Sequence, residues 1–168
     1  EWAGIETKWQ VEIDDYCQKL LSLRFPHTKK FTDVRRVDSH NLEKVDIISG
    51  GFPCPAFSQA GKQGGFEQDN LFYEIIRICN ERKPKAIIFE NVEGFKKWAE
   101  ILRQEIENIG YEWGDAIFDA RDFGIPQARR RYFAICIQRG MLSGTQYLRR
   151  IQREKDSRIY GLQSNNKN

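Results

Sequence analysis

The residue best suited to covalent chemistry is a cysteine held between two prolines. Cys54 lies in the stretch Gly50–Ser58, after a run of apolar residues, with Pro53 and Pro55 on either side. The prolines restrict φ, and the two glycines that open the stretch let a ligand come close to the backbone. A thiol becomes a strong nucleophile when nearby positive charge lowers its pKa. The pattern therefore predicts a rigidly mounted nucleophile, with a small buried side chain as the alternative.

Two later segments carry groups that could assist such a nucleophile. Glu90 ends an apolar stretch, where a partly desolvated carboxyl can be protonated and donate a hydrogen bond. A carboxylate paired with an arginine is the structural alternative. Arg129, Arg130 and Arg131 directly precede the apolar run 132–137. Since alternate residues of a strand point to opposite faces, we expect Arg129 and Arg131 to share one face and Arg130 to point away.

Alternating strands and helices are predicted around these segments. Apolar runs predict strands over 9–13, 45–48, 85–89, 111–118 and 132–137, and helical spacing predicts helices over 15–24, 70–82 and 96–109. This alternation is typical of an α/β fold with a doubly wound, mostly parallel sheet. Ligands of such sheets bind beyond the carboxyl ends of the strands, which draws attention to Glu12 and to residues 50–58 and 90–92.

Composition excludes several classes of protein. The 168 residues include four cysteines without a CxxC pair, so neither a zinc motif nor a disulfide framework is indicated, and no apolar run is long enough to cross a membrane. We expect a cytoplasmic protein with reduced thiols and no metal. Residues 121–168 hold 11 Lys and Arg against 3 Asp and Glu, which favours contact with a polyanion or a solvated basic tail.

Three segments, in this order, resemble the signature blocks of the DNA cytosine-5 methyltransferases. They are GGFPCPAFS over 50–58, ENV over 90–92 and DFGIPQARRR over 122–131. The resemblance covers about residues 1–138, which we expect to form a partial catalytic domain, followed by a basic polar tail over 139–168 that is partly disordered. It implies a Rossmann-like fold and an enzyme that moves a methyl group from S-adenosyl-L-methionine to C5 of a cytosine flipped out of double-stranded DNA.

The resemblance assigns roles to the residues already singled out. Cys54 matches the nucleophile that adds to cytosine C6, which makes C5 able to attack a methyl sulfonium. Glu90 matches the partner of ring N3, Arg131 the partner of O2 and Arg129 a neighbouring support. The family also implies a restriction-modification system and a prokaryotic or phage origin.

The resemblance places further residues at the cofactor. An acidic residue is expected to bind the ribose hydroxyls, its neighbour to pack on adenine, and a second pair to meet the adenine amino edge. Each could instead be a helix cap or a core residue. The family also marks residues 59–68 as a loop that closes over the flipped base. The positions that match cofactor contacts are Glu12, Ile13, Asp33, Val34, Pro53 and Leu71.

Two blocks of the family have no counterpart in these residues. The family begins with a strand and a glycine-rich turn that holds the methionine part of the cofactor, and it carries a target-recognition domain after the arginine block. The absent strand is central in the family's sheet, so its loss leaves unpaired strand edges. We therefore expect residues 1–168 to be a fragment with little activity alone, to which a complementing methyltransferase segment restores activity.

Two other functions stay open. A noncatalytic DNA-binding remnant of such an enzyme would bind duplex DNA with a strong salt dependence and transfer no methyl group. A dinucleotide-dependent oxidoreductase fits the acidic residue after the first predicted strand. That function, however, needs a GxGxxG turn, which the sequence lacks, and it gives no reason for a Pro-Cys-Pro loop.

Overall fold

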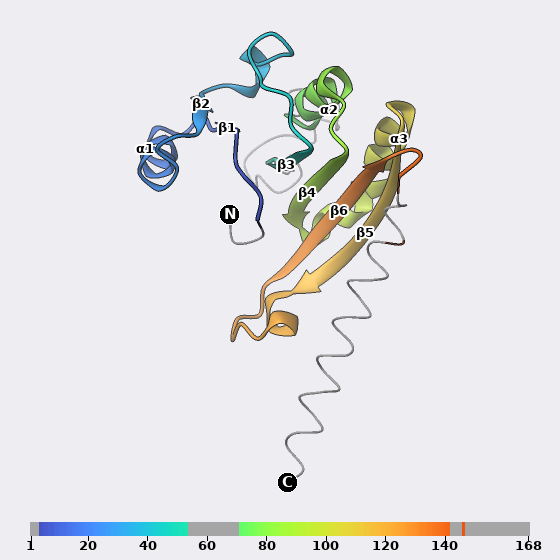
Figure 1. Cartoon of the computed structure of the whole chain (residues 1–168). Helices are drawn as coiled ribbons and strands as arrows, with labels where there is room; N and C mark the ends of the chain where they lie inside the picture. Colours follow the sequence, from blue (N-terminus) through green and yellow to red (C-terminus); the bar gives the residue numbers. More distant parts are fainter. Residues whose placement is uncertain (1–3, 54–70, 142–145, 147–168) are drawn as a thin grey trace, which may run out of the picture.

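The chain forms a two-stranded sheet and a four-stranded sheet (Figure 1). The computed structural model describes residues 4–53, 71–141 and 146, so Cys54 and the expected loop over 59–68 lie outside the described residues, as does most of the expected basic tail. β1 (Trp9–Val11) pairs in parallel with β2 (Lys29–Phe31), and α1 (Asp15–Arg24) connects them. The larger sheet has the order β3–β4–β6–β5, from β3 (Ile47–Gly51), β4 (Ala86–Val92), β5 (Tyr111–Asp119) and β6 (Arg130–Gln138).

Three of the four strands in the larger sheet run in the same direction. β3 and β4 are parallel, whereas β6 is antiparallel to both β4 and β5, so β5 runs with β3 and β4. Helix α2 (Leu71–Arg82) crosses from β3 to β4, and the 3-10 helix η3 (Glu93–Trp98) with α3 (Ala99–Asn108) connects β4 to β5. The predicted α/β class with a mostly parallel sheet is confirmed, and the reversed strand β6 is a feature that the sequence pattern did not indicate.

Local sequence signals explain where the helices begin and end. The Asp14 carboxylate caps α1 by accepting a hydrogen bond of 2.8 Å from the Cys17 amide. Pro84 follows α2 two residues after its last residue, and Gly110 follows α3 with a φ of 96°, a left-handed conformation that glycine adopts without strain. A further short 3-10 helix, η1 (Val34–Arg36), is capped by Asp33. The predicted helices over 15–24 and 70–82 are confirmed within the described residues.

Several predicted boundaries were wrong by two or three residues. β3 was expected over 45–48 but reaches Gly51, because Gly50 and Gly51 pair with Phe89 and Glu90. β4 was expected to end at Phe89 but continues to Val92, because its last residues pair with β6. The helix expected over 96–109 begins earlier as η3 and becomes α-helical only at residue 99, and β2 was not expected. Backbone pairing between strands sets the limits of β3 and β4, and the pattern of a single strand does not contain this information.

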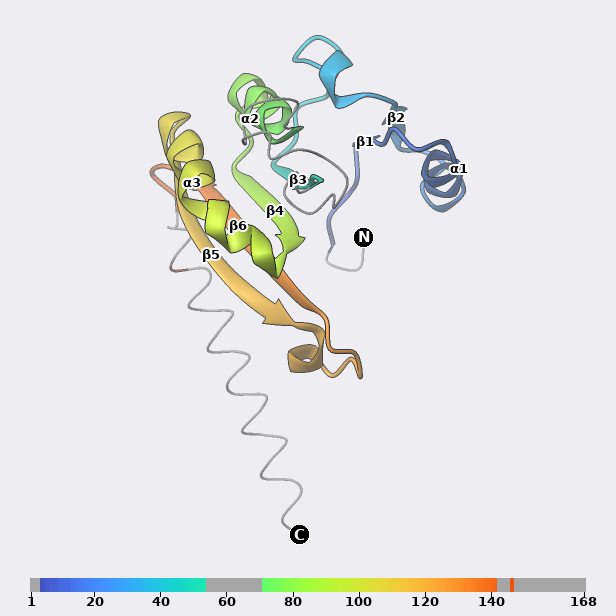
Figure 2. The ribbon, with the colours of Figure 1, turned by 180° about the vertical axis from the view of Figure 1, so that it is seen from behind.

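The main core lies between the larger sheet and the helices that cover one of its faces. Figure 2 shows η3 and α3 in front of the sheet, and α2 packs on the same face through Phe72, whose ring lies 5.6 Å from that of Phe89. Within the described residues, no helix is long and apolar enough to span a membrane. The fully buried side chains at this interface include Phe72, Phe89, Phe95, Leu102, Ile106, Tyr111 and Tyr132.

Candidate active site

An acid and a guanidinium from adjacent strands form an ion pair at one end of the larger sheet. Arg131 Nε of β6 lies 3.1 Å from Glu90 Oε1 of β4. In the β4–β6 register Arg131 is opposite Val92, so it is a diagonal neighbour of Glu90 on the same face. The Glu90 side chain is 40% exposed and that of Arg131 is 26% exposed, so both reach solvent. The structure thus brings two of the four predicted catalytic residues, Glu90 and Arg131, into contact.

The carboxyl end of β3, which leads to Cys54, lies beside Glu90. Gly51 pairs with Glu90 in the β3–β4 ladder, and a Cβ atom at Gly51 would lie 3.2 Å from Glu90 Oε2. A side chain at this position would therefore press on the carboxylate. Cys54 itself lies outside the described residues, but the strand that ends three residues before it runs beside Glu90.

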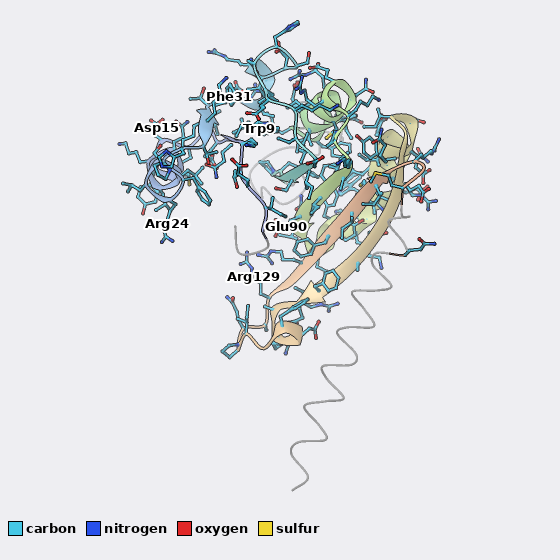
Figure 3. All side chains as sticks on the ribbon, viewed as in Figure 1. Trp9, Asp15, Arg24, Phe31, Glu90 and Arg129 are labelled. Atoms are coloured by element: carbon cyan, nitrogen blue, oxygen red, sulfur yellow. The ribbon has the colours of Figure 1, made fainter. Side chains whose placement is uncertain are left out.

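The other two arginines lie at the same end of the sheet. Arg130 Nη2 lies 2.9 Å from Glu93 Oε1, so Arg130 and Arg131 have different partners, as the predicted alternation requires. Arg129 is exposed and directly precedes β6, so it lies just outside the strand whose alternation was expected to place it on the face of Arg131. Figure 3 shows Arg129 and Glu90 at the same end of the sheet.

The connection between β5 and β6, residues 120–129, positions the arginines at this end of the sheet. Asp119 caps the 3-10 helix η4 (Ala120–Phe123) in a capping box with Asp122, and Gly124 closes the turn with a φ of 81°. The Arg121 side chain donates two hydrogen bonds to the Asp119 carboxylate and holds its pKa well below the usual range. The turn is completed by the Ala120 amide, which donates to the Arg129 carbonyl at 3.0 Å.

A cavity of about 590 Å³ opens between β1 and β3, beside the Glu90–Arg131 pair. Its volume is in the range that small-molecule sites occupy. Ser49, Gly50 and Gly51 of β3 form one wall, which places the cavity next to the Glu90 position. The structure brings all the predicted cofactor residues to this one cavity, namely Glu12, Ile13, Asp33, Val34, Pro53 and Leu71.

The two acids of the cavity are each held by the backbone. Glu12 Oε1 accepts a hydrogen bond of 2.9 Å from the Asp14 amide, and Asp33 Oδ1 accepts one of 2.9 Å from the Arg35 amide. Each of these bonds uses one carboxylate oxygen and fixes the position of the other. Ile13 is 66% exposed and offers an apolar surface against which a ring could pack. Two anchored acids beside apolar side chains fit the hydroxyl groups and base of a nucleoside.

The described thiols are poor candidates for the nucleophile. Cys79 and Cys136 are buried in the core, and burial raises the pKa of Cys79 to about 12 and that of Cys136 well above its ordinary value. The hydrogen bond to Asp14 raises the pKa of Cys17. Across residues 4–53 and 71–141, no three His, Cys, Asp or Glu side chains gather as a metal site would need.

Sequence reasoning assigned no role to Asn91 or Phe52, although both lie inside the matched segments. Asn91 is 5% exposed and its Nδ2 donates a hydrogen bond of 3.0 Å to the Phe52 carbonyl. The signal that could have found Asn91 is its polar side chain on the same face of β4 as the apolar Ile87 and Phe89, where burial requires a hydrogen-bond partner.

Comparison with known proteins gives a consistent picture. The model of the C-5 cytosine-specific DNA methylase family matches residues 1–167. The type II methyltransferase M1.ScrFI of Lactococcus lactis subsp. cremoris is 37% identical over 149 residues, which are 83% of this chain and 37% of that protein. The type II methyltransferase M.HhaI of Haemophilus parahaemolyticus is 35% identical over 145 residues, 82% of this chain and 44% of that protein.

Solved structures of low identity share the fold. The Dnmt2 methyltransferase of S. pombe superposes with a TM-score of 0.65 at 20% identity, over 82% of this chain and 46% of that one. A Spodoptera frugiperda DNMT2 variant gives 0.64 at 21% identity, over 81% and 44%. The chain spans less than half the length of the curated relatives described above.

Proposed function

The chain belongs to the C-5 cytosine-specific DNA methylase family, and on this premise we propose that it carries the catalytic part of an enzyme that methylates C5 of cytosine in double-stranded DNA. The observation that carries the proposal is the Glu90–Arg131 pair, which lies beside the end of the strand that leads to Cys54. The type II methyltransferases among its relatives support a role in a restriction-modification system, in the cytoplasm of a prokaryote or phage-infected cell.

The proposed reaction begins with activation of a weak nucleophile. The Cys54 thiolate donates an electron pair to C6 of a flipped cytosine, and the ring electrons move toward N3 and O2. The Glu90 carboxyl would hydrogen-bond to N3 and Arg131 would donate to O2, so the contact between these two side chains is exchanged for contacts to the base. Arg129 would support O2 from the start of β6. After C5 is methylated, its proton leaves to water, the C6–S bond breaks and the Cys54 thiolate is regenerated.

The cavity between β1 and β3 fits the methyl donor that this reaction needs. When bound, S-adenosyl-L-methionine supplies an electrophilic methyl group on a sulfonium. Glu12 would hold the ribose hydroxyls, Asp33 with Val34 the adenine amino edge, and Ile13 the adenine ring, with Pro53 and Leu71 as further contacts. The fit rests on the two backbone-anchored carboxylates and the apolar side chains beside them.

Covalent trapping tests the proposed chemistry. Duplex DNA that contains 5-fluorocytosine blocks loss of the C5 substituent, so the chain mixed with its complementing methyltransferase segments is expected to remain attached to it in the presence of S-adenosyl-L-methionine. The adduct should disappear in Cys54→Ser and persist in the matched variant Cys17→Ser, because Cys17 is a partly buried thiol on α1. An adduct that survives Cys54→Ser would refute the assignment. Salt-dependent binding without any adduct, even after the complementing segments are added, would favour a noncatalytic remnant.

We further infer that a second polypeptide segment completes the sheet. Among the described residues, β1 pairs with β2 and β3 pairs with β4, so one edge of β1 and one of β3 face the cavity between them. Helix α1 has no buried residue, and Tyr16, Leu20 and Leu23 are exposed. Open strand edges and uncovered apolar side chains support an added strand and helix, without which activity should be low.

Complementation tests this second proposal. The chain is mixed with the corresponding N-terminal and target-recognition segments of a type II relative, and adduct formation is measured before and after mixing. Activity should appear only after mixing. A matched added segment with proline in the middle of its strand should fail, because proline cannot donate a ladder hydrogen bond. Full activity of the chain alone would contradict the inference.

A further inference from the structure

We propose that Asn91 is a positioning residue that fixes the start of the Cys54 loop relative to Glu90, a proposal that rests on the function proposed above. Among the described residues, Asn91 is the one buried residue with an amide or charged side chain. A buried amide must satisfy its hydrogen-bonding groups or destabilise the fold. The partners of Asn91 are therefore informative.

Both ends of the Asn91 amide are engaged at the point where the β3–β4 ladder stops. Its Nδ2 donates to the Phe52 carbonyl at 3.0 Å, and its Oδ1 accepts from the Val92 amide at 2.8 Å. The last backbone pair of the ladder is Gly51 with Glu90, so Phe52 stands one step beyond it. A side-chain amide thus continues the connection between the two strands after backbone pairing has ended.

The Phe52 ring gives the same residue a second anchor. Phe52 is 5% exposed, and its ring centroid lies 5.4 Å from that of Phe72, 6.0 Å from that of Phe89 and 5.2 Å from that of Phe95. Aromatic contacts at these distances are favourable. The carbonyl and the ring together fix Phe52, and only Pro53, with its restricted φ, separates it from Cys54.

Strand β4 therefore positions both groups proposed to act on the base, Glu90 directly and Cys54 through Asn91. Glu90 points to the face where Arg131 lies, and its neighbour Asn91 points to the opposite, buried face and holds Phe52. The thiol must reach C6 while the carboxyl meets N3 of the same ring, so an error in their separation reduces the rate. Displacement by about 1 Å can cost on the order of 100-fold in rate.

The test compares two variants of Asn91 with a surface control. Asn91→Asp keeps the shape of the side chain and loses the Nδ2 donor, and Asn91→Ala removes both hydrogen bonds. Asn108→Asp makes the same chemical change on the exposed end of α3. Thermal unfolding identifies any variant that fails to fold. Phe52→Leu, which keeps the backbone carbonyl bond and loses the ring contacts, gives an intermediate case.

Two readouts separate the anchor from its catalytic consequence. Hydrogen exchange of the chain as it stands should be at least about 10-fold faster in the segment 51–54 of Asn91→Asp and unchanged in α3. In the chain assembled with its complementing segments, adduct formation on 5-fluorocytosine DNA should slow by about 10- to 100-fold, with KM for DNA and for S-adenosyl-L-methionine within about twofold of the unsubstituted value.

The outcomes test the anchoring of Phe52, the positioning of Cys54 and the proposed function separately. Unchanged exchange at 51–54 would overturn the anchor, whatever the activity. Faster exchange with an unchanged adduct rate would overturn the positioning role, as would a loss that appears entirely in KM. Should the unsubstituted assembly form no adduct at all, the proposed function fails, and the exchange measurement still decides whether Asn91 holds Phe52.

Discussion

Gly51→Ala should slow catalysis without unfolding the protein. A Cβ atom at Gly51 would lie 3.2 Å from Glu90 Oε2 and 3.8 Å from the Glu90 carbonyl oxygen. The first distance is shorter than a relaxed contact, so the carboxylate must move by a few tenths of an ångström. The φ of Gly51 is not in the left-handed region, so alanine fits the backbone conformation. The substitution therefore acts on one side chain, that of Glu90.

The expected magnitudes follow from this displacement. Replacing glycine by alanine at a compatible position stabilises a protein by about 0.4–1 kcal/mol through the unfolded chain, and the close contact offsets a similar amount, so net stability should change by less than about 1 kcal/mol. A shift of the Glu90 carboxyl changes its distance to the base and to Arg131. Since a 1 Å error costs about 100-fold, a few tenths of an ångström should reduce the adduct rate by about 3- to 10-fold.

Gly50→Ala is the matched control. Its Cβ atom would meet Ile75 Cδ1 at 2.8 Å, the end of a flexible side chain that lines the cavity, and no part of Glu90. Adduct formation by the chain assembled with its complementing segments is measured on 5-fluorocytosine DNA at saturating S-adenosyl-L-methionine, and the stability of the chain is measured by urea unfolding. Gly50→Ala should change the affinity for the cofactor more than the saturated rate. Equal rates for Gly51→Ala and the unsubstituted protein, or equal losses in both variants, would refute the reasoning.

Three other predictions use separate parts of the structure. Arg131→Gln should lower the adduct rate by about 100- to 1000-fold, because one charge that stabilises the transition state is lost, whereas Arg103→Gln on the surface of α3 should not. Tyr111→Phe removes a buried hydrogen bond of 2.6 Å to the Pro84 carbonyl and should cost about 1–2 kcal/mol in urea unfolding with no change in adduct rate. Cys79 should make stability fall with rising pH, since its pKa is about 12 in the fold and about 9 when unfolded, so above pH 9 only the unfolded thiol ionises. Between pH 9 and 10 the loss of stability should be smaller by about 1 kcal/mol in Cys79→Ala, and an unchanged loss would contradict this.

The grouping of the candidate site residues could be predicted in part from the sequence, because most of them lie near the ends of strands. The six residues expected at the cofactor come from four separate stretches of chain, and all of them line one cavity. Glu90 and Arg131, separated by 41 positions, form an ion pair. Most of these residues lie near the carboxyl ends of strands, which converge in an α/β sheet, whereas Leu71 begins α2 and Arg131 lies near the start of the reversed strand β6.

Features that depend on pairing between strands could not be predicted. Gly50 and Gly51 have low strand propensity, and they are in β3 because β4 pairs with them. The short strand β2 exists through its pairing with β1 and carries no alternating pattern of its own. The role of Asn91 depends on a contact across 39 positions, which a single sequence without a structure does not contain.

The reversed direction of β6 determines which changes the protein should tolerate. β6 begins beside the carboxyl ends of β3 and β4, so Arg130 and Arg131 lie at that end of the sheet. The last residue of β6, Gln138, lies at the opposite end. Beyond that end the backbone is held by single hydrogen bonds, from the Arg139 amide to the Gly110 carbonyl and from the Met141 amide to the Gln138 carbonyl. A reporter protein inserted after residue 141 would therefore leave the guanidinium groups undisturbed, whereas one inserted between Phe123 and Arg129 would carry them away from Glu90. Because β6 is reversed, its carboxyl end should tolerate an inserted protein, whereas the connection before it should not.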